Sequence, residues 1–368
     1  MLREIRWYNI ETMPKKERVV VAMSGGVDSA VAAGLLKEQG YEVIGITLCF
    51  NLAERNAKRP SCCGLEGIED ARRVARKLGI KHYILNMRRP LVEFVIQDFC
   101  SEYAQGRTPN PCVRCNQYIK FGALLEKARS LEAKFLASGH YARVVKAKEG
   151  YQLKKAKDPL KDQSYFLYRL NQKQLSYTLF PLGDYSKKET RALAKKFGLP
   201  VADKPASQEI CFLPQDYREF LKEKIGKRIM PGLVADKTGR VLGAHKGVAF
   251  YTVGQRQGLG IAAGFPLYIT GIRAEDNLIT VGRKEDAYRR EFLVKEPHFI
   301  LKPLKKKVAV KVKIRYNHRE APAEIIPVKR QIKVEFSSPQ FAVTPGQAAV
   351  FYQRDNLLGG GIIDKVTG

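Results

Sequence analysis

A pair of glycines between two serines is the first candidate chemical group, and it follows a short apolar run at 19–23. Glycines let the backbone pass close to an anion, and their amide groups form a concave set of donors. The hydroxyls of Ser24 and Ser29 add two donors, and Asp28 is placed to cap a helix or to hold Mg²⁺. The pattern is neither G-x-x-x-x-G-K-[ST] nor G-x-G-x-x-G, so a Walker A loop and a dinucleotide cofactor are both disfavoured. The segment therefore predicts a nucleotide-phosphate loop of another type, with an ordinary strand-to-helix turn as the alternative.

Three of the seven cysteines form the second candidate group. Cys112 and Cys115 make a C-x-x-C in a segment predicted to be a loop between two helices, and Cys211 follows in a second loop. A structural zinc would need a fourth ligand, and the chain has no second C-x-x-C. Two uses remain open. One is thiol chemistry, with one cysteine as nucleophile and another as persulfide carrier. The other is an iron–sulfur cluster with three protein ligands and one open iron.

The remaining cysteines are not expected to act. An odd number of cysteines in a chain of 368 residues argues against a disulfide scaffold. Cys49 ends an apolar strand and Cys100 lies in an amphipathic helix, so both fit inert core thiols. Cys62 and Cys63 are adjacent in the sequence, and we assign them no role because neighbouring residues rarely bind one metal together.

The order of the predicted elements places these groups. Short β-branched runs alternate with helical segments through the first 140 residues, which indicates right-handed βαβ units and a parallel sheet covered on both faces. The predicted strands are 18–23, 41–50, 81–87 and 133–139, and the predicted helices are 28–40, 66–79, 90–106 and 119–132. In such a sheet the ligand lies beyond the carboxyl ends of the strands. Leu48 and Gly139 would then flank the nucleotide, and His140 would be catalytic, structural or directed toward a nucleic acid.

Beyond residue 212 the pattern changes. Gly- and turn-rich segments occupy 213–283, and short β-branched strands separated by turns follow from about 290. The latter pattern is typical of an antiparallel barrel or sandwich. We therefore expect an α/β protein: a doubly wound parallel sheet, then a small connector and a C-terminal antiparallel β-barrel. The expected domain limits are 1–212, 213–284 and 285–368.

The net charge of +28 at pH 7 is one-sided and predicts a polyanionic partner, with nucleic acid as the first candidate. The excess is concentrated in 301–320, which carries eight Lys and Arg residues and one acid. No apolar run approaches the length of a membrane span, and the N-terminus lacks the pattern of a secretory signal. These observations predict a cytoplasmic protein with no membrane partner.

The hexapeptide 24–29 resembles the PP-loop, SGG-x-DS, of ATP pyrophosphatases, which implies cleavage of ATP between its α and β phosphates. Further ordered blocks extend the resemblance over nearly the whole chain, which is identified as a member of the tRNA-specific 2-thiouridylase (MnmA, or TrmU) family. The blocks are AMSGGVDSAVAA (22–33), GRTPNPCVRCNQYIKFGALL (106–125), ASGHYAR (137–143), KDQSYFLYRL (161–170), SQEICF (207–212), GxHxGxxxYTxGQRxGLGI (243–261) and TPGQAAVFY (344–352).

The resemblance implies the 2-thiolation of the wobble uridine, position 34, in tRNAs for Lys, Glu and Gln. ATP would adenylate the C2 oxygen, and sulfur would displace AMP. The target base would leave its stack, which costs little in an anticodon loop. The implied ATP-binding residues are Ala22, Met23, Ser24, Gly25, Gly26, Val27, Asp28, Ser29, Leu48 and Gly139. The implied tRNA-binding residues are Lys161, Asp162, Gln163, Arg315 and Tyr316, with Asn110 and Pro111 bordering the flipped base.

One position departs from the family's usual form, which reads NPD-x-x-CN. Cys112 stands in place of that aspartate, while Cys115 matches the nucleophile and Cys211 the persulfide carrier. The third thiol makes the chain similar to family members and related tRNA thiolases in which three cysteines hold a [4Fe–4S] cluster. In those proteins the fourth iron binds the transferred sulfide. We therefore expect these three cysteines to ligate such a cluster. The alternative is a persulfide on Cys211, with Cys115 as nucleophile and a transient disulfide between the two.

The sulfur donor would be a cysteine desulfurase, a relay protein or free sulfide. Two other classes of function compete with this one. One is a PP-loop synthetase acting on a small molecule, which the net charge, the barrel and the lack of a glutaminase domain disfavour. The other is an RNA-binding module with a vestigial nucleotide site, which the intact loop serines, Asp28, Cys115 and Cys211 disfavour.

Overall fold

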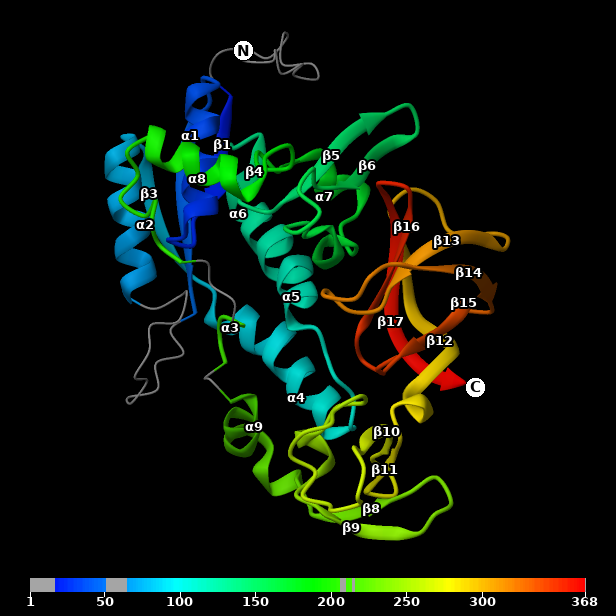
Figure 1. Cartoon of the computed structure of the whole chain (residues 1–368). Coiled ribbons are helices and arrows are strands. Elements are labelled where there is room, and N and C mark those ends of the chain that lie inside the picture. The colour runs from blue at the N-terminus through cyan, green and yellow to red at the C-terminus, as the bar shows by residue number, and fades with distance from the viewer. Residues whose placement is uncertain (1–16, 51–64, 206–209, 214–215, 368) are drawn as a thin grey trace.

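The computed structural model describes residues 17–50, 65–205, 210–213 and 216–367, so Cys62 and Cys63 lie outside the described residues. Three parts are visible in Figure 1: an α/β part that carries the N-terminus, a smaller part around β8–β11, and a barrel that carries the C-terminus. This arrangement confirms the expected fold class. Within the described residues, no helix has both the length and the apolarity of a membrane span.

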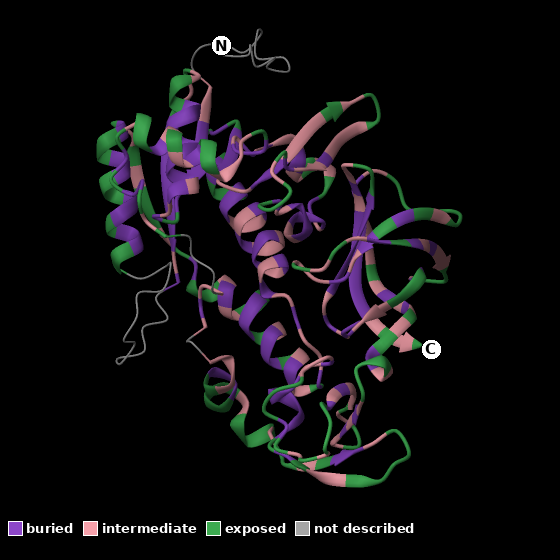
Figure 2. Cartoon of the chain, viewed as in Figure 1, coloured by how far each residue is buried: buried purple, intermediate pink, exposed green. Residues whose placement is uncertain are grey.

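The α/β part is built on a parallel sheet with the strand order β3-β2-β1-β4-β7. Its strands are β1 (Arg18–Ala22), β2 (Glu42–Cys49), β3 (Lys81–Asn86), β4 (Phe135–Ser138) and β7 (Thr178–Leu179). The β-branched run Val19–Val21 is fully buried at the centre of the sheet, where both faces are covered by helices. Figure 2 shows this buried column continuing into the helices packed beside it. β2 and β3 lie on one side of β1, and β4 and β7 lie on the other. In open parallel sheets ligands bind at the carboxyl ends of the strands where the order switches in this way, which here is between β1 and β4.

The first helices along the chain begin and end near their expected positions, whereas the helical structure after residue 110 differs from the expectation. They are α1 (Val27–Glu38), α2 (Leu65–Leu78), α3 (Arg88–Leu91), η1 (Val92–Ile96), α4 (Gln97–Ala104), α5 (Pro111–Arg114), η2 (Cys115–Ala123), α6 (Leu124–Ser130), η3 (Ser164–Leu167), α7 (Gln172–Ser176) and α8 (Lys187–Lys196). The expected loop across 107–117 is wrong in its second half, because helical structure starts at Pro111 and continues to Ser130. Asn110 is the N-cap and proline occupies the first helical position, which is a common helix start that the sequence reading overlooked.

The connector contains a short helical segment and a four-stranded sheet of order β10-β11-β8-β9. Its elements are α9 (Tyr217–Ile225), η4 (Gly226–Arg228), β8 (Gly232–Ala235), β9 (Val241–His245), η5 (Val248–Phe250), β10 (Tyr268–Arg273), β11 (Leu278–Gly282) and η6 (Glu285–Ala287). It packs on the α/β part through aromatic side chains: Phe99 of α4 lies 5.5 Å from Phe212 and 6.2 Å from Phe220 between ring centroids. The connector is thus fixed to the helix that precedes the C-x-x-C.

The barrel has six antiparallel strands and closes through a pairing of β12 with β17. The strands are β12 (Tyr288–Phe299), β13 (Val308–Lys313), β14 (Ala321–Val328), β15 (Gln331–Phe341), β16 (Ala348–Gln353) and β17 (Asn356–Thr367). A hairpin from the α/β part, β5 (Ala142–Ala147) and β6 (Gly150–Lys155), pairs with β17 and extends the barrel sheet. The hairpin follows directly from β4, so one stretch of chain connects the parallel sheet to the barrel (Figure 1).

Candidate active site

The glycine-rich segment connects β1 to α1 at the carboxyl edge of the parallel sheet. The amide of Ser24 donates to Ser29 Oγ at 3.2 Å, and the Ser29 hydroxyl donates to the Gly26 carbonyl at 3.2 Å. Gly25 has a φ of +76°, a left-handed conformation that favours glycine. Ser24 is exposed while Ser29 is buried, so the loop presents one hydroxyl to solvent and uses the other to hold its own shape.

Two close backbone approaches fix this loop in place. A Cβ on Gly25 would lie 2.2 Å from the carbonyl oxygen of Gly67 in α2. A Cβ on Gly139, just beyond β4, would lie 2.7 Å from the amide nitrogen of Ser29. Any side chain at either position would push the loop away from its neighbours. Gly139 therefore lies against the loop, and Leu48 is buried two residues beyond the β2 position that pairs with Ala22.

Asp28 has two partners that sequence reading did not identify. The Tyr141 hydroxyl donates to Asp28 Oδ1 at 2.8 Å, and the Lys187 Nζ lies 2.5 Å from the same oxygen. Tyr141 is 2% exposed, and burial next to Asp28 raises the pKa of its hydroxyl, so that hydroxyl stays protonated. The capping box of Ser186 and Glu189 is a sequence signal for the start of α8, but nothing local indicates that this start faces the loop.

His140 connects the loop to the helix that carries the C-x-x-C. Its ring centroid lies 5.9 Å from those of Phe121 in η2 and Phe180, and Nδ1 lies 2.7 Å from Ser138 Oγ. Burial, with a smaller contribution from Lys120, lowers the pKa of His140 well below its ordinary value. The imidazole is therefore neutral at pH 7. Of three successive residues, Gly139 contacts the loop, His140 contacts η2 and Tyr141 binds Asp28.

Cys112 and Cys115 lie one helical turn apart at the start of the helix that Asn110 caps. The Asn110 side chain accepts a hydrogen bond from the Val113 amide at 3.3 Å. Cys115 is 8% exposed and packs in the largest core cluster, whereas Cys112 is half-buried. Each of the two thiols has a contact with another group in the structure.

Cys211 lies on a separate segment, and its half-buried side chain packs against the same large core cluster, which also contains residues of the connector and the barrel. It lies close in sequence to residues 206–209, which are outside the described part of the chain. Across the described residues, no three His, Cys, Asp or Glu side chains are arranged so that they could hold one metal ion. In a [4Fe–4S] cluster each cysteine binds a different iron, so the expected cluster stays a prediction.

The segment 161–163, which is expected to contact tRNA, is held in shape by hydrogen bonds to neighbouring residues. The Asp162 carboxylate is 6% exposed and accepts from the amides of Ala156 and Ser164 at 3.0 and 3.2 Å. Gln163 Oε1 accepts from the Tyr141 amide at 3.0 Å. Only Lys161 of this trio is exposed. Asp162 thus shapes the segment instead of presenting its carboxylate to solvent, and Gln163 ties it to the residue that binds Asp28.

Aromatic side chains gather where this segment meets the barrel. The Tyr165 hydroxyl donates to the Ala348 carbonyl at 2.9 Å and is also bonded to the Asn110 side chain. The ring of Phe166 lies 4.6 Å from that of Tyr316, and Arg315 faces Tyr165. The expected base-bordering residue Asn110 and the barrel pair 315–316 are therefore joined through 165–166, although they are some 200 positions apart in the chain.

The barrel also holds the segment that precedes the helix start. The Thr108 amide donates to the Pro345 carbonyl at 2.8 Å, and the Gln347 side-chain amide donates to the Thr108 carbonyl at 2.9 Å. The block TPGQ at 344–347 therefore positions the block RTPNP at 107–111. The block at 161–170 packs on both of these blocks.

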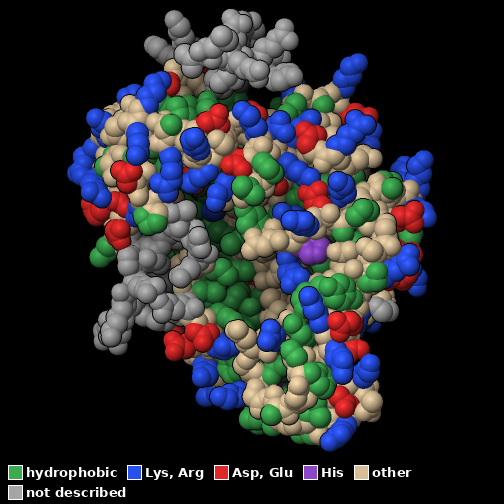
Figure 3. Space-filling view, in the orientation of Figure 1, with side chains coloured by type: hydrophobic (Ala, Val, Ile, Leu, Met, Phe, Trp, Pro, Cys, Tyr) green, Lys and Arg blue, Asp and Glu red, His purple; other side chains and the backbone are tan. Residues whose placement is uncertain are grey.

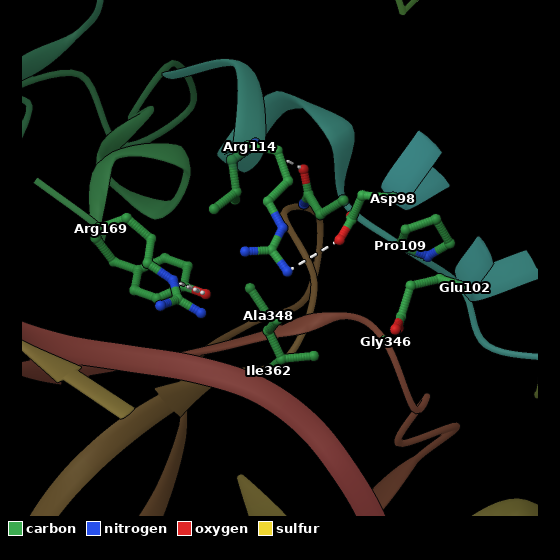
Figure 4. Close-up of a pocket in the computed structure, with 11 residues that line it drawn as sticks. Asp98, Glu102, Pro109, Arg114, Arg169, Gly346, Ala348 and Ile362 are labelled. Atoms are coloured by element: carbon green, nitrogen blue, oxygen red, sulfur yellow. Dashed lines mark hydrogen bonds and ion pairs between the residues drawn. The ribbon is translucent and has the colours of Figure 1, made fainter. Parts of the chain in front are cut away.

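A pocket at this junction is lined by Asn110, Arg114, Arg169 and Ala348, among others (Figure 4). Figure 4 shows Arg114 pointing across it toward Asp98, with a nitrogen–oxygen distance of 3.0 Å. Arg169 is 2.8 Å from Glu296 of the barrel. Burial raises the pKa of Asp98 although Arg114 opposes that shift. Both arginines already have carboxylate partners, and the Arg169–Glu296 pair joins the α/β part to the barrel.

Lys and Arg side chains are spread over the α/β part and the barrel in Figure 3, with acidic side chains between them. The exposed lysines of the stretch 301–320 are Lys302, Lys305, Lys306, Lys307 and Lys311. Hydrophobic side chains line a hollow near the centre of the face shown in Figure 3, with basic side chains along part of its edge and acidic side chains below it. A surface of this kind can contact an RNA backbone along its rim.

Comparisons with known proteins agree along the whole chain. Residues 17–215 match the family described as the tRNA methyl transferase HUP domain, residues 218–283 its PRC-barrel domain, and residues 289–363 the aminomethyltransferase beta-barrel domain. The tRNA-specific 2-thiouridylase MnmA 1 of Caldanaerobacter subterraneus subsp. tengcongensis is 50% identical over 361 residues, covering 96% of this chain and 99% of that protein. The tRNA-specific 2-thiouridylase MnmA of Geotalea uraniireducens is 49% identical over 358 residues, covering 95% and 96%.

A solved structure of a 4-thiouridine synthetase–RNA complex with bound ATP aligns with 58% of this chain and 51% of that one, at 16% identity. Its TM-score is 0.36, which is too low to bear on function.

Proposed function

The chain belongs to the tRNA-specific 2-thiouridylase family, and from this premise we propose that it thiolates C2 of the wobble uridine in tRNAs for Lys, Glu and Gln. The proposed reaction consumes ATP and releases AMP and pyrophosphate. The observation that supports it most directly is the stretch 139–141, which contacts the phosphate loop, the C-x-x-C helix and Asp28 in turn. This stretch supports a proposal in which the ATP site and the thiol site share one region.

The first step uses the loop residues. The backbone amides of 24–29 and the exposed Ser24 hydroxyl would bind the phosphates, and Gly139 lets the end of β4 lie against the loop backbone. The C2 oxygen of the uridine attacks the α phosphorus, and the bond to the β-phosphate oxygen breaks. Asp28 offers a carboxylate of the type that Mg²⁺ prefers, and that ion would neutralise phosphate charge when bound.

The target base would enter beside Asn110 and Pro111. Asn110 is held by its cap to Val113 and by Tyr165, so its position is set before the base arrives. Arg315 and Tyr316 stand beside the same aromatic group, and Lys161 is exposed for a phosphate contact. Asp162 and Gln163 would act by holding the segment in shape.

For sulfur transfer we propose two routes that the assays below separate, the expected three-cysteine [4Fe–4S] cluster and a persulfide on Cys211. The terminal sulfur of a Cys211 persulfide forms a bond to C2, and AMP leaves with the former C2 oxygen. The Cys115 thiolate then attacks the remaining Cys211 sulfur, which releases the 2-thio group and leaves a Cys115–Cys211 disulfide. A thiol reductant restores the two thiols, and a desulfurase, a relay protein or sulfide supplies the next sulfur.

The decisive assay incubates the full chain with ATP, a sulfur source and unmodified tRNA, and measures AMP and 2-thiouridine together. We expect AMP formation that depends on tRNA and equals the 2-thiouridine formed. AMP formation without tRNA would favour a small-molecule synthetase. Binding of tRNA without AMP formation, with or without sulfur, would favour an RNA-binding module with a vestigial nucleotide site.

Iron and acid-labile sulfide in anaerobically purified protein separate the two sulfur routes. The persulfide route predicts full thiolation in iron-free protein and activity of Cys112→Ser. Activity that appears only after iron reconstitution, and is lost in Cys112→Ser, would instead establish the [4Fe–4S] cluster that the third cysteine suggests. The thiolation reaction itself stands under either result.

A further inference from the structure

The phosphate loop carries no cationic side chain of its own. Residues 22–29 contain neither Lys nor Arg, and the pattern lacks the lysine of a Walker A loop. Backbone amides and hydroxyls can bind phosphate oxygens, but a leaving pyrophosphate gains negative charge that such donors neutralise only in part. Enzymes that transfer phosphoryl or nucleotidyl groups usually place a Lys, an Arg or a metal ion at that point.

Among the described residues, a cation reaches the loop from 159 positions further along the chain. The Nζ of Lys187 lies 2.5 Å from Asp28 Oδ1, and its side chain is 17% exposed. Its main-chain amide donates to Asp158 Oδ2 at 3.0 Å, which fixes the base of the side chain. The ammonium group is thus held at the loop by contacts at both ends of the residue.

This position is a poor one for a lysine on grounds of helix stability. Lys187 is the first residue of α8, where the positive end of the helix dipole disfavours a cation. The next residue, Lys188, shares that unfavourable position but is exposed. The partly buried contact with the loop therefore gives Lys187 a role that the helix itself does not require.

Asp28 does not depend on this lysine alone. The Tyr141 hydroxyl donates to the same carboxylate oxygen at 2.8 Å, and Tyr141 is itself held 3.0 Å from Thr190 Oγ1. The carboxylate would therefore keep one anchoring contact if Lys187 turned toward a phosphate. The side chain of Lys187 is flexible enough for such a shift, because its four-carbon stem ends in a rotatable ammonium.

We propose that Lys187 is a catalytic residue that binds the β and γ phosphates of ATP and stabilises the pyrophosphate as it leaves. The inference rests on the proposed function. As the C2 oxygen bonds to the α phosphorus, the electron pair of the breaking bond passes to the pyrophosphate oxygen. The Lys187 ammonium neutralises part of that new charge. Before ATP binds, Asp28 holds the ammonium in place.

The test compares Lys187→Met, Lys187→Arg and the matched control Lys188→Met in tRNA-dependent AMP formation. We expect Lys187→Met to lower kcat/KM for ATP roughly 100-fold, with the KM for tRNA unchanged. Lys187→Arg keeps the charge and should recover part of the loss, and Lys188→Met should match the parent protein. A Lys187→Met variant within a few-fold of the parent would overturn the proposal.

A second comparison separates phosphate binding from the positioning of Asp28. Tyr141→Phe removes the other contact of the same carboxylate oxygen. If Lys187 only positions Asp28, then Lys187→Met and Tyr141→Phe should cause similar losses and the double variant no further loss, which would overturn the proposal. If Lys187 binds phosphate, Lys187→Met should lower AMP formation more than Tyr141→Phe does. The loss in Lys187→Met should also depend on ATP concentration in a different way.

A binding measurement tests the role of Lys187 without relying on catalytic turnover. Inorganic pyrophosphate and ATP should each raise the melting temperature of the parent protein, and should raise that of Lys187→Met less. The melting temperature without ligand shows whether the variant is folded. If the parent forms no AMP with tRNA, the proposed function fails, while an equal ligand shift in parent and variant is the result that refutes the role of Lys187.

Discussion

The phosphate loop and the C-x-x-C helix start are both placed for chemistry, but they are held in different ways. The loop is fixed by neighbours in its own sheet: the Met23 amide donates to the Ile46 carbonyl at 2.8 Å, and the Thr47 hydroxyl donates to the Met23 carbonyl at 2.8 Å. The helix start is fixed by another domain, through the contacts of Pro345 and Gln347 with Thr108.

The geometry of the phosphate loop thus depends on contacts within the α/β part, whereas that of the C-x-x-C helix start also depends on the barrel. Arg107 illustrates the second case. Its guanidinium, 14% exposed, contacts Glu102 of α4 at 2.8 Å and the Ile363 carbonyl of β17 at 3.0 Å. An RNA that binds across the barrel and the α/β part would therefore act on the geometry of the thiol site more than on that of the phosphate loop.

The largest expected effect is a loss of sulfur transfer while ATP binding is kept. Cys115→Ala should lower 2-thiouridine formation by roughly a thousandfold or more, because it removes the proposed nucleophile. ATP binding should persist, since the loop is unchanged. The measurement is 2-thiouridine in tRNA by mass spectrometry, beside ATP binding by calorimetry. Cys100→Ala is the matched control, because both thiols are buried in one core cluster. Equal loss in the two variants would show that packing, not chemistry, is responsible.

A smaller effect tests the docking itself. Arg107→Ala leaves Glu102 and the Ile363 carbonyl without this partner, and removing one member of a buried ion pair costs about 3 kcal/mol. We expect a lower unfolding midpoint and a fall of roughly tenfold in kcat/KM for tRNA, because the helix start loses its alignment. The affinity for ATP should hardly change. The control is Arg72→Ala, which breaks an exposed pair with Glu69 in α2. A parallel loss of ATP affinity in Arg107→Ala would contradict the independence of the phosphate loop from the helix start.

The smallest expected effect concerns acid stability. Burial, with Arg315 and Lys313 beside it, lowers the pKa of His318 in the barrel from 6.5 to about 4. Between these values the unfolded chain binds a proton that the folded chain does not, so stability is lost as pH falls. His318→Asn should lose about 1 kcal/mol less than the parent protein between pH 7 and pH 5, after allowance for partial exposure. Chemical unfolding at both pH values measures this. An identical pH dependence in both proteins would refute it.

The pKa values of the other four histidines are shifted in the same direction. Burial lowers the pKa of His82, His140, His245 and His298, so each disfavours proton uptake in the folded state. Because they lie in all three parts of the chain, the parent protein should lose stability throughout as the pH falls below about 6.5.

The sequence predicted the alternation of the α/β part well, because buried parallel strands and helices have distinct patterns over lengths of several residues. It failed at 107–117, where the Asn-Pro helix start was taken for a loop. It also gave no sign that β5 and β6 would extend the barrel, because pairing between distant strands leaves no local pattern. The domain limits at 212 and 284 stay predictions, as do the roles of the site residues.

What the sequence determined by itself was the phosphate loop, the thiols and the excess of positive charge, since these depend only on residue type and short spacing. The tertiary structure decided which groups face one another. It brought Lys187 and Tyr141 to Asp28, placed Asn110 beside Tyr165, and turned Asp162 inward. The physical reason is that such contacts join residues tens to hundreds of positions apart, and only the packing of sheet, helices and barrel sets the distance between them.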